Sequence, residues 1–296
     1  MFGRLDRLND GTTLARETAG LPGVSLALGG GFASGFAHLG VLQVLEQQQI
    51  PVRAIAGTTL GAVFGAAYAS GVPVGRIIST FQKVRLRKAA CWRLRGVESA
   101  NSGKLDVLLK VMVQADTFEN LMIPVAAVAT DLGSGDPVVF RQGELRDALR
   151  ASCAFPGLFR PVKLGTRCLA DGSLVSPVPV HAARELAPGF VVGVFAGSQD
   201  TCSGEAGSVF HVVSRAIHAV HKNHGESWEK EADLMLRPET PALLWDDFAQ
   251  ADKAVAAGAA AARNALPRIR KYLAQAAATS PLIAEEHYRL PAEVRE

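Results

Sequence analysis

The stretch AIAGTTLGA, residues 54–62, constrains the fold more than any other part of the chain. A short apolar strand runs into a tight turn and then directly into a helical segment. Gly57 and Gly61 bracket a hydroxyl residue in the pattern G-x-[S/T]-x-G. This pattern is typical of a nucleophilic oxygen held on a strained corner, with a helix N-terminus directly behind it. The central residue is Thr59 and not serine, so the expected nucleophile carries an extra methyl group.

Strands and helices alternate around this corner. An apolar strand at residues 24–28 runs into Gly29-Gly30-Gly31, and a helix is predicted over residues 34–49. A second strand at residues 52–56 precedes the corner, and the helix behind the corner is predicted to end at Gly71. This order predicts an α/β fold with a parallel sheet covered by helices on both faces.

The rest of the chain continues the alternation. Strands are predicted at residues 124–130, 137–140, 167–170, 190–195 and, at a sheet edge, 234–236. Helices are predicted at residues 144–152, from about residue 209, and over residues 249–276 with an interruption at Pro267. Between them, the proline-bounded apolar stretch at residues 154–162 suits either a pocket wall or plain core.

Asp171 follows the predicted strand at residues 167–170 and precedes Gly172. The carboxyl end of a sheet strand is where α/β proteins place functional groups. An aspartate before glycine is also common in a simple turn, so both interpretations stay open at this point.

The composition is that of an ordinary globular protein with a large core. The 296 residues are 48% hydrophobic and 20% charged, and the formal net charge of +3 gives no signal for nucleic-acid binding. The four cysteines are scattered without a C-x-x-C pair, which disfavours a disulfide framework or a zinc site and favours a reducing compartment. We find neither a signal peptide nor an apolar run long enough to span a bilayer, and therefore expect a cytoplasmic protein with at most peripheral membrane contact.

A basic stretch occupies residues 76–95. It contains seven lysines and arginines, no acidic residue, and Trp92 among them. Such a stretch can contact anionic lipid or an acidic partner, but it is also what a solvated helix and loop look like. We carry peripheral membrane contact through residues 76–95 as a hypothesis.

Four histidines fall on the helix predicted from residue 209. His218 and His221 are three residues apart, as are His221 and His224. A metal site also needs a carboxylate or a further ligand in a cavity, so the pattern favours one polar helix face over a metal site. We therefore expect no bound metal and no organic cofactor.

The ordered motifs GGGFASGFAHLGVL, GTTLGA and DGSLVSPVPV resemble those of the bacterial branch of the patatin-like phospholipase family, which reads GGGAARGxAHxGVL, GTSxGA and DGGxxxNPVP. The intervening stretches ATDLGSGDPVVF and LRASCAFPGLFRPV resemble that branch as well. The resemblance covers roughly residues 22–200. It implies a three-layer α/β/α sandwich with a mostly parallel central sheet, and the hydrolysis of acyl esters, usually of lipids, by a serine–aspartate dyad without histidine.

By position in these motifs, the resemblance implies that Thr59 is the nucleophile and that Asp171 takes its proton. The backbone amides of Gly29, Gly30 and Gly31 are then expected to form the oxyanion hole. His38 matches a family histidine and is expected to be structural. The same resemblance makes residues 22–200 the catalytic core. We expect residues 1–21 to be a loose lead-in and residues 201–296 to add a strand and helices packed on the core, with a loose tail after about residue 280.

The sequence departs from the family motifs near the expected site. Thr59 replaces serine, Phe32 stands where a small residue is usual, and Ser34 replaces an arginine. Ser173 and Ser176 replace glycine and asparagine beyond Asp171. The branched Thr59 side chain is costly at a corner that requires a positive φ angle, and its methyl group hinders attack.

Three functions remain as hypotheses. The first is a lipid acyl hydrolase, attenuated by Thr59. The second is a catalytically silent family member that binds acyl lipid or membrane and acts through partners. The third, a nucleotide-binding oxidoreductase, is weak because the glycines read G-x-G-x-x-x-G, one residue longer than the dinucleotide fingerprint. The ester substrate and the oligomeric state are not specified by these motifs.

Overall fold

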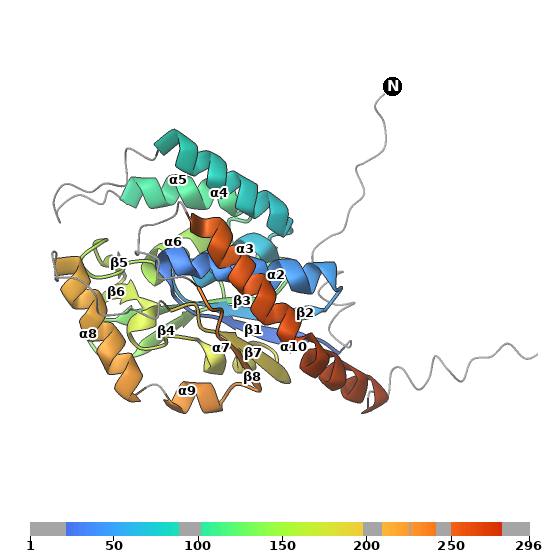
Figure 1. The fold of residues 1–296 in the computed structure, drawn as a ribbon. Coiled ribbons are helices and arrows are strands. Elements are labelled where there is room, and N and C mark those ends of the chain that lie inside the picture. The colour runs from blue at the N-terminus through green and yellow to red at the C-terminus, as the bar shows by residue number, and fades with distance from the viewer. Residues whose placement is uncertain (1–21, 89–101, 198–208, 225, 241–249, 280–296) are drawn as a thin grey trace, which may run out of the picture.

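A computed structural model of the chain describes residues 22–88, 102–197, 209–224, 226–240 and 250–279 (Figure 1). The lead-in expected at residues 1–21 and the tail expected after residue 280 lie outside these ranges. Within the described ranges, no helix combines the length and the apolar character needed to cross a bilayer.

The centre of the fold is an eight-stranded sheet with the order β5-β6-β3-β2-β1-β7-β8, in which β4 also pairs with β3. Five strands form the parallel part: β1 (Val24–Leu28), β2 (Val52–Gly57), β3 (Val125–Asp131), β7 (Phe190–Val194) and β8 (Leu234–Leu236). Three strands pair antiparallel near β3: β4 (Pro137–Phe140), β5 (Val162–Leu164) and β6 (Arg167–Asp171). The prediction of a mostly parallel sheet is confirmed.

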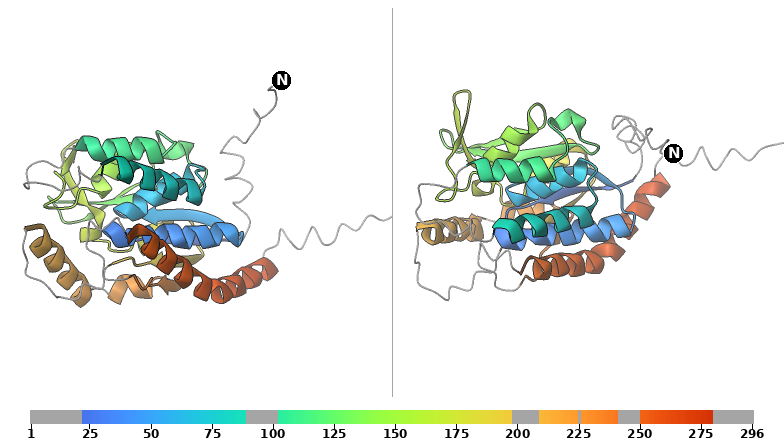
Figure 2. Two further views of the ribbon diagram at one scale, coloured as in Figure 1. Left: turned by 45° about the horizontal axis from the view of Figure 1, so that its top comes forward. Right: turned by 90° about the horizontal axis from the view of Figure 1, so that it is seen from above.

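Helices cover both faces of this sheet (Figures 1 and 2). The larger layer contains α2 (Ala37–Gln47), α3 (Leu60–Ala69), α4 (Val74–Lys88), α5 (Ser102–Met112), α6 (Leu145–Ser152) and α10 (Ala251–Thr279). The opposite layer contains α7 (Val180–Leu186) and α9 (Glu226–Lys230). The three-layer α/β/α sandwich is therefore confirmed.

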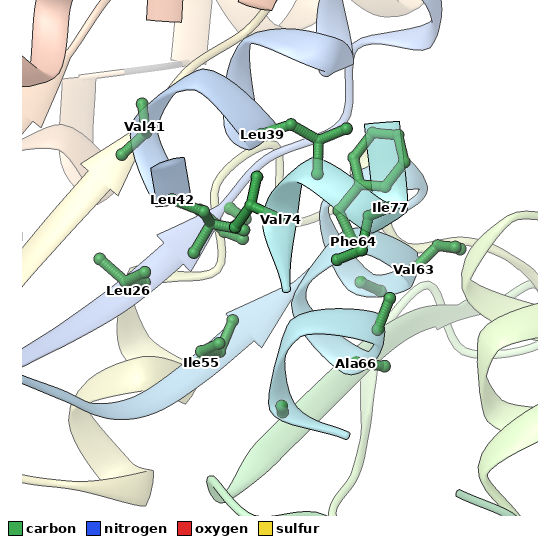
Figure 3. Packing of buried hydrophobic residues seen from close by; sticks show 14 of the residues in the cluster. Leu26, Leu39, Val41, Leu42, Ile55, Val63, Phe64, Ala66, Val74 and Ile77 are labelled. Atoms are coloured by element: carbon green, nitrogen blue, oxygen red, sulfur yellow. The ribbon is translucent and has the colours of Figure 1, made fainter. Parts of the chain in front are cut away.

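Residue size differs between the two faces of the parallel strands. Leu26 and Ile55 point into the larger core, where they pack with Phe64 of α3 (Figure 3), and Leu28 belongs to the same core. Their strand neighbours, such as Ala27, point to the α7 side. Because successive side chains of a strand alternate between faces, this pattern lets α7 approach the sheet closely and reserves the other face for the large core.

Two glycines allow α10 to pack directly on α2. A Cβ atom on Gly40 would lie 1.9 Å from the Val255 carbonyl oxygen, and one on Gly258 would lie 1.9 Å from the Ala37 carbonyl oxygen. The two helix backbones are thus in contact, and only glycine fits on either side of the crossing.

Most predicted elements are present, with three differences. The helix expected from residue 34 begins as a 3-10 helix, Phe32–Phe36, before α2 takes over. The apolar stretch at residues 154–162 leads into β5, which was not predicted. The predicted interruption at Pro267 is wrong, because α10 continues to Thr279 and accommodates the proline by bending, as Figure 1 shows.

Candidate active site

The corner after β2 has the strained backbone that its sequence predicts. Thr59 has φ 53° and ψ −125°, and it is the N-cap of α3. A Cβ atom on Gly57 would lie 2.4 Å from Ala62 Cα, and one on Gly61 would lie 2.2 Å from the Leu28 carbonyl oxygen. Strand and helix pass so close that only glycine fits at both bracket positions. The strain at Thr59, of order 1–3 kcal/mol, has to be supported by the surrounding contacts.

Strand pairing explains how Asp171 reaches this corner. Both β4 and β2 pair with Ala127 of β3, so these two strands lie on opposite edges of β3. Both β4 and β6 pair with Ala129, so β6 lies on the same edge as β2. Strands β2 and β6 run in opposite directions along this edge, and their carboxyl ends meet. Gly57 ends β2 opposite Ala127, and Asp171 ends β6 opposite Ala129.

Thr59 and Asp171 form a direct hydrogen bond. The Thr59 hydroxyl donates to Oδ1 of Asp171 at 2.7 Å and lies 3.0 Å from Oδ2. Asp171 is fully buried, whereas Thr59 keeps 6% of its surface exposed. The structure therefore places these two predicted site residues within proton-transfer distance, with access from solvent on the Thr59 side.

Asp171 is held through both its carboxylate and its backbone carbonyl. The Ser173 amide donates to Oδ1 at 2.8 Å, and the Thr130 hydroxyl donates to the Asp171 carbonyl oxygen at 2.8 Å. Burial raises the pKa of Asp171 to about 6, and the hydrogen bonds from Ser173 and Thr59 oppose this rise. A carboxylate with this pKa is ionised at neutral pH yet basic enough to accept a proton from a hydroxyl group during reaction.

Ser152 supports the corner and was not predicted as a site residue. The Thr59 amide donates to Ser152 Oγ at 3.1 Å, and Ser152, the last residue of α6, is fully buried. This bond satisfies the backbone of the strained residue. The stretch LRASCAFPGLFRPV, which contains Ser152, resembles the family motifs, and this was the only signal in the sequence that pointed to it.

The glycine loop differs from its predicted role in one respect. The Gly29 amide donates to the Val194 carbonyl at 3.1 Å, and the Gly30 amide donates to the Pro177 carbonyl at 3.3 Å. Two of the three amides predicted for the oxyanion hole therefore already have acceptors, because the loop continues the hydrogen bonding at the end of β1. Among the described residues, the Gly31 amide has no acceptor.

Gly30 faces the nucleophile through its Cα atom. A Cβ atom there would lie 3.0 Å from Thr59 Oγ1 and 3.2 Å from Ser173 Cβ. A side chain at this position would crowd the hydroxyl group of Thr59. The loop therefore contributes open space in front of Thr59 in addition to its backbone donors.

His38 has a structural place behind the loop. It is fully buried in α2, and its Nε2 atom lies 2.8 Å from the Gly29 carbonyl oxygen. Burial lowers the pKa of His38 to about 4, so the ring is neutral at physiological pH and donates to this carbonyl. This contact fixes the start of the loop and agrees with the prediction that His38 is not a third member of the dyad.

An aromatic cluster adjoins the loop. Phe32, with a φ of 41°, packs edge-on against Phe155 with 4.9 Å between ring centroids. Phe155 and Leu158 form a buried apolar group, and Val213 and Ile217 of α8 (Val209–His224) pack against it. The half-buried Phe32 thus joins the loop next to Thr59 to an apolar surface made by residues 154–162 and α8.

Among the residues that the structure describes, no group of three or more potential metal ligands occurs. His221 Nε2 instead lies 3.2 Å from the Leu174 carbonyl oxygen. Of the basic stretch at residues 76–95, Arg76 is exposed on α4, whereas Trp92, Arg93 and Arg95 lie outside the described residues. Membrane contact through this stretch stays a prediction.

Comparison with known proteins agrees with the geometry of the site. The family described as patatin-like phospholipase matches residues 26–184, a range that contains the glycine loop, the corner and Asp171. The chain belongs to the patatin-like phospholipase family.

Two relatives illustrate the range of this family. An uncharacterized NTE family protein of Mycobacterium tuberculosis is 36% identical over 174 residues, which is 54% of this chain and 45% of the relative. Patatin-like phospholipase domain-containing protein 6 of Mus musculus is 31% identical over 215 residues, which is 67% of this chain and 15% of that protein. The chain thus spans less than half the length of both relatives.

A solved structure supports the fold independently. VipD from Legionella pneumophila is similar with a TM-score of 0.51 and 14% sequence identity, over 84% of this chain and 67% of that one. At this identity the similarity concerns the fold and not the substrate.

Proposed function

We propose that the protein hydrolyses carboxylic esters of lipids, with Thr59 as the nucleophile and Asp171 as the general base. The observation that carries the proposal is the 2.7 Å hydrogen bond from the Thr59 hydroxyl to Asp171, on a strained corner of a patatin-like chain. We further propose that residues 22–200 form the catalytic core and that α10 stabilises it through α2. The dyad requires neither a metal nor an organic cofactor.

The first half of the reaction forms an acyl-enzyme. Thr59 Oγ1 attacks the ester carbonyl carbon while its proton moves to the Asp171 carboxylate. The resulting tetrahedral intermediate collapses, the bond to the leaving alcohol breaks, and the proton on Asp171 passes to the alcohol oxygen. Thr59 is left as an ester of the acyl group.

The second half returns the enzyme to its starting state. A water molecule gives a proton to Asp171 as it attacks the acyl carbonyl of the Thr59 ester. Collapse of the second tetrahedral intermediate releases the carboxylic acid, and the proton returns to Thr59 Oγ1. Asp171 thus acts as base and as acid in each half, and its pKa of about 6 suits both roles near neutral pH.

The oxyanion of each intermediate needs free amide donors. Among the described residues, the amides of Gly31 and Leu60 have no acceptor, whereas the Thr59 amide is bound to Ser152. Leu60 is the first residue of α3, where helix amides lack internal partners and the helix dipole favours negative charge. We propose that these two amides form the oxyanion hole, as hydrolases do with the residue after the nucleophile and a nearby loop.

A binding function without turnover is the second candidate. It is favoured by Phe32, which replaces a small residue and packs against Phe155 beside the loop. The methyl group of Thr59 also favours a binding function, since it adds bulk next to the attacking oxygen atom. On this alternative, the site retains an acyl chain and the protein acts through partners.

Turnover of short and medium p-nitrophenyl esters separates the two candidates. We would compare the unmodified protein with Thr59→Ser and Asp171→Ala. The hydrolase proposal expects turnover that Asp171→Ala reduces by about 10²- to 10⁴-fold and that Thr59→Ser increases. If the unmodified protein is inactive and only Thr59→Ser turns over, the scaffold is competent and the natural nucleophile is silent. If all three are inactive, the binding function is favoured.

A further inference from the structure

Helix α8 lies along the rim of the active site. Its inward side chains Val213 and Ile217 pack on the cluster that contains Phe155 and Leu158, which in turn contacts Phe32 of the loop. Farther along the helix, His221 Nε2 lies 3.2 Å from the carbonyl oxygen of Leu174, three residues after Asp171. In Figures 1 and 2, α8 lies at one end of the molecule, remote from the C-terminal half of α10.

The outward face of α8 is apolar. Val212 and Val220 are 52% and 54% exposed, eight residues apart and therefore on one side of the helix. Ala216 and Ala219 lie between them and are exposed as well. A surface helix with one buried apolar face is expected to carry polar residues on the opposite face. Helix α8 carries Val212, Ala219 and neighbouring apolar residues there, with Arg215 on the same side.

The charge of α8 is of one sign. Residues 209–224 contain no aspartate or glutamate, and they contain Arg215 and Lys222. His218 is exposed on the described part of the helix. A helix with exposed apolar residues and only cationic charge is suited to the surface of an anionic membrane, where the apolar side chains enter the interface and the cations meet lipid phosphates.

We propose that α8 docks the protein on the surface of an anionic lipid bilayer through Val212 and Val220. The helix would lie in the plane of the interface, and its inward face would keep the contact with the aromatic cluster. This inference extends the proposed function, because it names the membrane surface from which the lipid substrate comes. The docking itself depends on exposed apolar residues and positive charge, and not on the catalytic dyad. It assigns this role to α8 and not to the basic stretch at residues 76–95.

Docking at this position has a direct consequence for a lipid substrate. The rim formed by Phe32, Leu174 and α8 would face the bilayer, so an acyl ester would pass from the interface to Thr59 without crossing bulk water. Hydrolysis of lipid in vesicles would then depend on Val212 and Val220, whereas hydrolysis of a short water-soluble ester would not.

Vesicle flotation tests the docking without relying on turnover. We would use vesicles of phosphatidylcholine with increasing phosphatidylglycerol, and a background of Asp171→Asn so that no lipid is consumed. Val212→Asp/Val220→Asp is the test variant. Val107→Asp/Val111→Asp on α5 is the matched control, because these valines are 44% and 50% exposed, also on one helix face. Val212→Ser/Val220→Ser repeats the test without adding charge.

We expect the α8 aspartate variant to lose vesicle binding by about tenfold or more, the serine variant to lose less, and the α5 control to bind normally. Normal binding by both α8 variants, or a loss confined to the α5 control, would overturn the proposal. A change of the α8 variants in oligomeric state by light scattering, with unchanged vesicle binding, would show instead that this face joins copies of the chain. In the Asp171-containing protein, the variants should retain turnover of p-nitrophenyl butyrate. Absence of that turnover bears on the hydrolase proposal alone, since flotation is independent of it.

Discussion

Backbone segments are in direct contact in two regions of the protein, the α2–α10 crossing and the corner after β2, and the two contacts have different consequences. At the α2–α10 crossing, Gly40 and Gly258 let the backbones of two regular helices touch. At the corner after β2, Gly57 and Gly61 let a strand and a helix touch, and the contact forces Thr59 to a φ of 53° beside a fully buried carboxylate.

The helix crossing stabilises the fold, whereas the corner is a strained site that the rest of the fold has to stabilise. Packing at the helix crossing removes apolar surface from water without strain, so every contact there favours the folded state. At the corner, backbone strain and the burial of Asp171 both oppose folding. The hydrogen bond that Ser152 accepts from the Thr59 amide and the one that the Ser173 amide donates to Asp171 offset only part of that cost. We therefore expect substitutions at the helix crossing to change stability alone, and substitutions at the corner to change activity.

The largest effect is expected from Asp171→Asn, which should lower turnover of soluble esters by about 10³-fold while making the protein more stable at pH 7.5. Because the folded protein raises the pKa of Asp171 to about 6, its ionised form opposes folding above that pH. The stability contributed by the protonated carboxyl is fully present below about pH 4 and is lost as the pH rises through about 6, by roughly 3 kcal/mol. Asparagine carries no such penalty, so its advantage should vanish below about pH 4.

Urea unfolding at pH 4, 6 and 7.5, together with turnover, checks this prediction. Asp136→Asn, a surface substitution, is the control and should change neither quantity. An Asp171→Asn protein that is less stable than the parent at pH 7.5 would show that the buried charge of Asp171 does not destabilise the folded protein.

The next effect contrasts two glycines directly. Gly30→Ala puts a methyl group 3.0 Å from Thr59 Oγ1, and we expect turnover to fall by about 10²-fold with a small change in stability. Gly40→Ala puts a methyl group 1.9 Å from the Val255 carbonyl oxygen, and we expect about 3 kcal/mol of destabilisation with unchanged turnover per folded molecule.

Gly75→Ala in α4 is the control for the Gly30 and Gly40 variants, because no atom lies within 4 Å of the added methyl group. It should stabilise the protein by up to about 1 kcal/mol through helix propensity alone. Turnover and urea unfolding measure the two effects. If Gly30→Ala and Gly40→Ala lose the same activity and the same stability, the distinction between the two regions is wrong.

A smaller effect is expected from pH. Asp171 acts as a base only when ionised, so kcat/KM for a soluble ester should rise with pH, reach half its maximum near pH 6, and be about tenfold below its plateau at pH 5. His38, with a pKa of about 4, stays neutral across this window and contributes no step there. A profile that is flat from pH 5 to pH 8 would exclude Asp171 as the base.

The smallest effect is expected from the contact that holds the corner. Ser152→Ala leaves the buried Thr59 amide without its acceptor, which should cost about 1–3 kcal/mol of stability and also lower kcat. Ser25→Ala is the matched control, because its buried hydroxyl donates to the Ala187 carbonyl at 2.9 Å, outside the corner. The control should lose similar stability and keep its kcat. If both variants keep kcat, Ser152 is structural only.

The sequence by itself determined the local pieces. Apolar runs predicted the strands β1, β2, β3 and β4, and the glycine bracket predicted the strained corner, because a strand and a helix in contact leave room only for glycine. The motifs also identified Thr59 and Asp171 as a pair, since each occupies a family position. Pro267 misled the prediction, because packing of α10 on α2 outweighs one lost hydrogen bond and a bend in the helix.

Only the tertiary structure decided how the pieces meet. The antiparallel course of β6 along the β2 edge of β3 sets Asp171 against Thr59, and no local pattern encodes strand pairing over more than 100 residues. The same holds for Ser152 under the corner, for the Gly29 and Gly30 amides that bind carbonyl groups of distant segments, and for α8 beside the aromatic cluster. A hydrogen-bond partner or a covered face depends on which segments become neighbours, and the burial of the large core by the whole chain decides that.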